Sequence, residues 1–278
     1  MKPAPFDYEQ PRSLDEAVEL LGRQGRFAKC LAGGQSLGPM LNLRLVGVDL
    51  IVDITRIAEL KAIEEDDGWL GLGACTTHAA IEDGTVPDVT GGLLPSVARG
   101  IAYRAVRTRG TIGGSLAHAD PAADWVSCLA ALDAQLIVFG PSGRRSVPIS
   151  EFMLGVFETV LGSDDILESV RIPKLDPTTR WGYYKVCRKT GEFAHAIAAV
   201  LHDPERGRWR AVVGATDSVP IILDDAAALF DGDLTPPLHE RFNRAAAARL
   251  LRDAGLSGDD HGLQIHVVAL DRAIRQLR

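Results

Sequence analysis

One stretch of small residues constrains this chain more than any other. Residues 111–124 read TIGGSLAHADPAAD, and an apolar run over residues 125–132 follows. Glycine can turn the backbone at positive φ, and it lets a ligand reach main-chain N–H groups without a Cβ in the way. Successive N–H groups in such a turn form a concave site for phosphate oxygens. A second segment of this kind, AGGQSLG at residues 32–38, follows the apolar run 27–31. The pattern predicts two glycine loops, each leaving a strand, that grip a diphosphate from two sides.

The composition excludes several classes of protein. The 278 residues are 46% hydrophobic and 24% charged, which is typical of a globular chain with a sizeable core. A net charge of −7 and the lack of a Lys/Arg-rich run argue against binding to nucleic acid or anionic membranes. No apolar stretch approaches the length of about 18 residues that a membrane span needs. The first residues lack the apolar core of a signal peptide, so we expect a cytoplasmic protein.

Motifs for other chemistries are missing from the sequence. The four cysteines, Cys30, Cys75, Cys128 and Cys187, are far apart, whereas iron–sulfur and structural zinc sites need clustered thiolates. We expect free thiols and no metal site. The chain also lacks the Gly-x-Gly-x-x-Gly fingerprint, the P-loop, His-Glu-x-x-His and the Gly-x-Ser-x-Gly elbow. A Rossmann dinucleotide site and hydrolase chemistry therefore receive no support.

The hydrophobic pattern divides the chain into three units. A capping box at residues 13–16 predicts a helix that ends near Gly22, and the strand at 49–54 is too apolar to lie at a sheet edge. Residues 39–45 suit either a short helix or an extended segment. The other expected strands are 27–31, 69–73, 136–139, 144–147, 166–172, 181–187, 194–201 and 209–215. The other expected helices are 77–82, 93–102, 125–132, 238–254 and 262–278. Strands in series followed by helices predict an α+β domain after a linker at 175–179.

The two glycine segments resemble the FAD pyrophosphate loops of the molybdenum hydroxylase flavoproteins. This family includes the medium subunit of aerobic carbon monoxide dehydrogenase and the flavin domain of xanthine dehydrogenase. The resemblance extends over VRTRG at residues 106–110, the strand 166–172 with Pro173, and Tyr184-Lys185.

The resemblance implies an α+β chain with the FAD-binding fold of the p-cresol methylhydroxylase/vanillyl-alcohol oxidase superfamily. Two α/β FAD subdomains would occupy residues 1–55 and 56–174. A C-terminal domain like that of carbon monoxide dehydrogenase flavoproteins would follow at 175–278, with a three-stranded antiparallel sheet and helices.

The resemblance also implies which residues bind FAD. Backbone N–H and hydroxyl groups of the two segments would hold the diphosphate. Asp124 would hold a flavin-side hydroxyl or else cap a helix, and Leu167 would pack on the isoalloxazine ring or else belong to the core. Lys185 would stabilise the reduced, anionic flavin or else be a solvated lysine. The expected set is Ala32, Gly33, Gly34, Gln35, Ser36, Leu37, Thr111, Gly113, Gly114, Ser115, Ala117, Asp120, Asp124, Leu167 and Lys185.

The function implied is that of an electron-transferring medium subunit, part of an oxidoreductase with no catalytic residue in this chain. A large molybdopterin subunit would oxidise the substrate, and a small subunit with two [2Fe–2S] clusters would pass the electrons on. FAD, bound noncovalently to this chain, would deliver them to an external acceptor, in a dimer of heterotrimers. Two alternatives stay open: a self-sufficient flavin oxidase of the same superfamily, and a non-catalytic nucleotide-binding scaffold.

Overall fold

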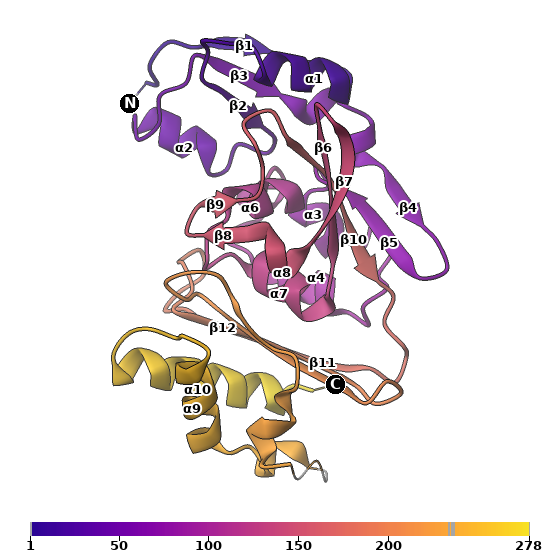
Figure 1. The fold of residues 1–278 in the computed structure, drawn as a ribbon, viewed down its shortest axis with the longest axis vertical. Coiled ribbons are helices and arrows are strands. Elements are labelled where there is room, and N and C mark those ends of the chain that lie inside the picture. Colours follow the sequence, from indigo (N-terminus) through magenta and orange to yellow (C-terminus); the bar gives the residue numbers. More distant parts are fainter. Residues whose placement is uncertain (1, 233, 235–236, 278) are drawn as a thin grey trace.

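Three β-sheets follow one another along the long axis of the molecule (Figure 1). The computed structural model describes residues 2–232, 234 and 237–277. A small parallel sheet with its helices lies at one end, a five-stranded antiparallel sheet lies in the middle, and a four-stranded antiparallel sheet with the C-terminal helices lies at the other end. The chain is therefore a mixed α/β structure.

The N-terminal sheet is parallel, with the order β1–β3–β2. Its strands are β1 (Asp7–Glu9), β2 (Ala28–Leu31) and β3 (Leu50–Asp53), and its helices are α1 (Leu14–Leu21) and α2 (Leu37–Asn42). All of β3 is buried between its neighbours, which confirms that it is not an edge strand. The N-cap half of the predicted capping box is confirmed, because the Ser13 hydroxyl accepts from the Glu16 N–H. The Glu16 carboxylate accepts from the N–H of Arg12, one residue before the N-cap, and not from that of Ser13. Two short 3₁₀ turns, Ile54–Arg56 and Glu59–Lys61, lead to the next sheet.

The middle sheet has the order β4–β5–β10–β6–β7. Its strands are β4 (Ile63–Glu65), β5 (Trp69–Gly73), β6 (Gln135–Gly140), β7 (Gly143–Pro148) and β10 (Ile166–Pro173). The helices of this part are α3 (His78–Glu82), α4 (Leu93–Gly100), α5 (Arg104–Arg107), α6 (Ile112–His118), α7 (Asp124–Leu132) and α8 (Ile149–Phe152). The predicted hairpin closes at Gly140 and Gly143, and Thr77 caps α3 as expected. A second, small hairpin consists of β8 (Met153–Gly155) and β9 (Glu158–Thr159).

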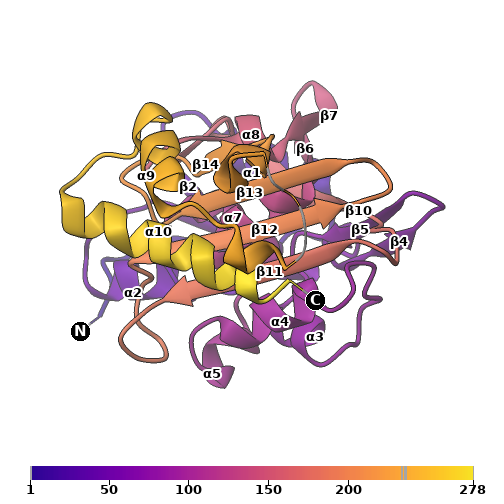
Figure 2. The same ribbon diagram turned by 90° about the horizontal axis from the view of Figure 1, so that it is seen from below.

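The C-terminal sheet has four strands in chain order, one more than predicted. They are β11 (Arg180–Val186), β12 (Ala196–Asp203), β13 (Arg208–Gly214) and β14 (Ile221–Leu223). The added strand, β14, was missed because it is only three residues long. Helix α10 (Asp260–Arg275) lies across one face of this sheet (Figure 2). The predicted end of this helix, Arg278, lies outside the described residues.

The helix predicted at residues 238–254 is wrong in its first part. A 3₁₀ turn occupies Leu238–Glu240, another covers Ala226–Phe230, and α9 runs only over Arg244–Asp253. The Asn243 side chain accepts from the N–H groups of Ala245 and Ala246, so Asn243 is the N-cap that starts the helix.

Helix α7 joins the middle and C-terminal parts. All nine of its residues are buried, because it packs against β10 on one side and against β12 and β13 on the other. Apart from Asp124 and Ser127 its residues are apolar on every side, and such a helix is expected to be enclosed in this way. The main core accordingly extends from Leu14 to Val212. Among the helices of the described part, none combines the length and the apolar character that crossing a bilayer requires.

Candidate functional site

The two glycine segments lie against each other. The first leaves β2 at the carboxyl edge of the parallel sheet, the edge where ligands bind in open α/β sheets. A Cβ added to Gly33 would lie 1.9 Å from the Arg109 carbonyl oxygen and 2.8 Å from the Gly110 Cα. One added to Gly114 would lie 3.9 Å from the Ala32 Cβ. Glycine at position 33 is therefore required by a close approach between the two segments.

The first segment carries a row of free main-chain donors. The N–H groups of residues 33–37 find no acceptor among the residues that the structure describes. Gly34 adopts φ +70°, and Gln35 and Ser36 are exposed, so the turn faces solvent. Consecutive unpaired N–H groups in a turn form a nest for anionic oxygens. This segment therefore fits a diphosphate.

The second segment differs from its prediction, because it is helical and its donors are used. It is neither a loop nor the continuation of a strand: Thr111 caps α6, and the helix begins at Ile112. The N–H of Ile112 donates to Thr76 O, that of Gly113 to Ala74 O, that of Gly114 to Thr111 Oγ1, and that of Ser115 to Thr111 O. These four N–H groups therefore donate within the chain, and a main-chain contribution of residues 112–115 to a diphosphate stays a prediction. The surface that remains consists of the exposed Gly114 and Ala117 and the half-exposed Ser115.

Two other residues of the second segment have packing or turn roles. A Cβ on Gly113 would lie 2.3 Å from the Ala74 Cβ, so this glycine lets α6 pack against the turn after β5. The Asp120 carboxylate accepts from the Ala122 N–H at 2.8 Å and closes the turn before α7. A diphosphate role for either residue stays a prediction.

Asp124 and Lys185, predicted separately, form one buried cluster. Lys185 Nζ lies 2.8 Å and 3.0 Å from the two carboxylate oxygens of Asp124, and the exposed fractions of the two side chains are 14% and 9%. Lys185 also donates to the Gly100 carbonyl at 2.8 Å. The Tyr183 hydroxyl donates to Asp124 Oδ1 at 2.7 Å. Burial and the nearby Asp124 raise the pKa of Tyr183 well above its ordinary value.

Sequence reasoning missed Tyr183, although a signal was present. Residues two apart in a strand point to the same face, so the spacing of Tyr183 and Lys185 could have indicated that the two side chains lie together on β11. The cluster links α7 to β11 and the end of α4, and so it joins the middle and C-terminal sheets. Its polar groups satisfy one another across that junction.

Leu167 is buried in the main core on β10. The core alternative for this residue therefore describes its surroundings, and contact with a flavin ring stays a prediction. A register shift in β10 follows it, between Leu167 and Ser169.

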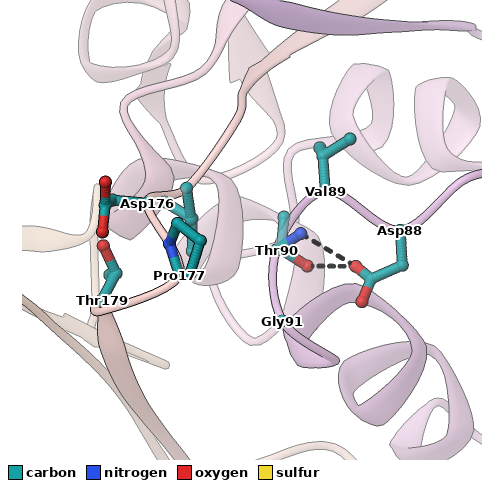
Figure 3. A pocket seen from close by; sticks show the side chains of 8 residues that line it. Asp88, Val89, Thr90, Gly91, Asp176, Pro177 and Thr179 are labelled. Atoms are coloured by element: carbon teal, nitrogen blue, oxygen red, sulfur yellow. Dashed lines mark hydrogen bonds between the residues drawn. The ribbon is translucent and has the colours of Figure 1, made fainter.

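A separate hollow of about 250 Å³ lies between the loop at residues 88–91 and the segment at 175–179 (Figure 3). None of the predicted site residues lines it. The Asp88 carboxylate accepts from the N–H and hydroxyl of Thr90, and Asp176 does the same for Thr178. Both carboxylates are used in local turns, and their negative charge disfavours a diphosphate in this hollow.

Comparison with known proteins extends the geometric picture. Residues 4–175 match the family described as the FAD binding domain in molybdopterin dehydrogenase. The carbon monoxide dehydrogenase medium chain of Hydrogenophaga pseudoflava is 40% identical over 201 residues, which are 72% of this chain and 70% of that protein. The nicotine 6-hydroxylase medium subunit of Paenarthrobacter nicotinovorans is 31% identical over 270 residues, which are 95% of this chain and 94% of that protein.

Solved structures give the same result over nearly the whole chain. One is a carbon monoxide dehydrogenase from Hydrogenophaga pseudoflava that lacks the Mo-pyranopterin moiety of its cofactor, with a TM-score of 0.84 and 32% identity. The match covers 99% of this chain and 98% of the chain in that structure. The quinoline 2-oxidoreductase from Pseudomonas putida 86 matches with a TM-score of 0.84 and 33% identity. The match covers 99% of this chain and 97% of the chain in that structure.

Proposed function

This chain belongs to the family of FAD-binding domains of molybdopterin dehydrogenases, and from that premise we propose that it is the FAD-carrying medium subunit of a heteromeric molybdenum hydroxylase. Such a subunit is part of an oxidoreductase, and the large and small partner subunits carry the molybdopterin and the [2Fe–2S] clusters. The observation that carries the proposal is the row of free N–H groups at residues 33–37, placed where the family match lies.

Each part of the site has its own task in this proposal. The N–H groups of residues 33–37 bind the diphosphate, and the close contact of Gly33 with Arg109 fixes them beside α6. Ser115 and Ala117 border the cofactor from the second segment. Asp124, held by Tyr183 and Lys185, presents an oriented carboxylate and a cation to the flavin end. Bound FAD supplies the redox chemistry, taking electrons from the clusters and giving them to an external acceptor.

The finer assembly is part of the same proposal. We place FAD subdomains at residues 1–55 and 56–174 and the C-terminal domain at 175–278, in the fold of the p-cresol methylhydroxylase/vanillyl-alcohol oxidase superfamily. The sheet boundaries at Asp53 and Pro173 support this division. The complete enzyme would be a dimer of heterotrimers. The cytoplasmic location stays a prediction.

Cofactor content tests the function directly. The complex, purified through a tag on this chain from its host, should be yellow, contain one FAD per copy of the chain, and include a large and a small subunit. Acid precipitation should release all of the flavin into the supernatant, because the attachment is noncovalent. A colourless complex would favour the scaffold alternative. Turnover of an organic substrate by the FAD-loaded chain alone would favour the self-sufficient oxidase.

A further inference from the structure

The β8–β9 hairpin presents an apolar surface beside the second glycine segment. The exposed fractions of the Leu154, Val156 and Phe157 side chains are 56%, 46% and 60%, and we call these three residues the hairpin patch. Figure 1 shows the hairpin next to α6, at the side of the molecule. Large apolar side chains that are exposed together, and not singly, mark binding surfaces.

The hairpin patch is held on a firmly attached base. Phe152 and Met153, which precede it, are buried in the main core. The Phe157 N–H donates to the Ala119 carbonyl at 2.9 Å, and the Phe157 ring centroid lies 5.0 Å from that of His118. Phe157 adopts φ +59°, a conformation that bulky side chains rarely take. Residues 156–157 form the tight turn of the hairpin, between the paired Gly155 and Glu158, and such turns require a residue at positive φ. The turn and the contacts at its base thus fix the position of an aromatic ring that remains exposed.

We infer that the hairpin patch is the docking surface for the small [2Fe–2S] subunit, an inference that rests on the proposed function. The two residues that hold Phe157, His118 and Ala119, belong to the segment that borders the cofactor. A protein that covers the patch therefore lies beside the FAD. Electron transfer requires the donor to be close to the flavin, whereas the large subunit and a second copy of this chain have no such requirement.

The surroundings of the patch have the composition of a permanent interface. Glu151 and Glu158, both exposed, flank the apolar side chains. An apolar centre with a charged rim is the usual arrangement of such surfaces. The matching surface of the small subunit is then apolar, with Lys or Arg around its edge.

The test removes the apolar side chains from the assembled enzyme without disturbing the fold. In the variant Leu154→Ser/Phe157→Asn, asparagine tolerates the left-handed backbone of position 157. Val156→Ser is a milder second variant. Phe27→Ser is the matched control, because Phe27 is 51% exposed but lies on the N-terminal sheet, before β2. Each protein is purified through a tag on this chain from a host that produces all three subunits, and subunit ratios and FAD content are measured by native mass spectrometry.

We expect both hairpin variants to keep their thermal transition, and the double variant to bind the small subunit about tenfold or more weakly, as when central interface residues are truncated. Phe27→Ser should leave the ratio unchanged. A double variant that retains the small subunit fully would overturn the inference. So would selective loss of the large subunit, or a change only in the number of copies of this chain. Wild-type protein without FAD and without any small subunit would instead refute the proposed function.

Discussion

Replacing Lys185 by methionine tests the buried cluster, because the change leaves the Asp124 carboxylate without its cationic partner. Methionine keeps the length and apolar stem of lysine. It leaves Asp124, whose side chain is 9% exposed, with the Tyr183 hydroxyl as its one remaining side-chain donor among the described residues. Removal of one partner from a buried ion pair costs about 3–5 kcal/mol. The Lys185 side chain is 14% exposed and Tyr183 still donates, so we expect a lower value, about 2–3 kcal/mol of unfolding free energy.

The assay is urea denaturation of the full chain, monitored through the fluorescence of the buried Trp125 and Trp181. The double variant Asp124→Asn/Lys185→Met removes both charges and should recover most of the loss, to within about 1 kcal/mol of wild type. Lys189→Met, at an exposed position, is the matched control and should change nothing. If Lys185→Met unfolds at the wild-type urea concentration with an unchanged m-value, the pair is solvated and our account of the cluster is wrong.

The same variants report on the flavin in the assembled complex. Loss of the Lys185 charge, with Asp124 left negative, should lower the FAD potential. If the change in the field at the flavin is worth about 1–2 kcal/mol at an effective dielectric near 20, the shift is tens of millivolts. A potential that is unchanged within error would remove both residues from the flavin site.

Two further predictions follow from packing and titration. Gly33→Ala should lower the unfolding free energy by about 1–3 kcal/mol and weaken FAD binding, because its Cβ would press on the Arg109 carbonyl. A Cβ at Gly38 has no atom within 4 Å, so Gly38→Ala should raise the unfolding free energy by up to about 1 kcal/mol. Equal urea midpoints for the two variants would contradict this. Burial lowers the pKa of His78 from 6.5 to about 4, where the neutral ring accepts from Trp125 Nε1, so the unfolded chain binds the extra proton between these values. His78 should therefore stabilise the fold fully above pH 6.5 and lose its contribution as the pH falls toward 4, at up to about 1.4 kcal/mol per unit. The urea midpoints at pH 7 and pH 5 should differ less in His78→Gln than in the wild type, and equal pH dependence in both proteins would refute the assignment.

Much of the fold could be predicted because its elements carry local signals. Local sequence patterns predicted four strands of the middle sheet, β5, β6, β7 and β10, and the cap at Ser13 predicted the first helix. Strand β4, whose three residues are all exposed, was not predicted. Elements that depend on distant contacts were missed. Strand β1 has three exposed residues with no apolar pattern, and it exists because it pairs with β3, more than forty residues away. The start of α9 was misplaced because the alanine-rich pattern was extended backward past its cap, Asn243.

The second glycine segment was misjudged because its local preference is overridden. Two adjacent glycines disfavour a helix by about 1 kcal/mol each relative to alanine, so the sequence suggested a loop. In the structure the Thr111 cap and the contact of Gly113 with Ala74 fix the helix, and both depend on the turn after β5. Tertiary packing outweighs propensity here.

The glycines of the two segments therefore have different physical roles, although their sequences are alike. Gly33 and Gly113 lack a Cβ because protein backbone or side chain occupies the space, at Arg109 and at Ala74 respectively. Residues 33–37 form a run of consecutive N–H groups that have no acceptor in the part of the chain that the structure describes, whereas those of residues 112–115 are used within the chain. If the diphosphate binds there, a change at Gly113 that lowers FAD content acts through the packing of α6, and it should lower the unfolding free energy of the FAD-free chain as well. A change that removes an N–H donor at residues 35–37 should weaken FAD binding while leaving the FAD-free chain nearly as stable as wild type.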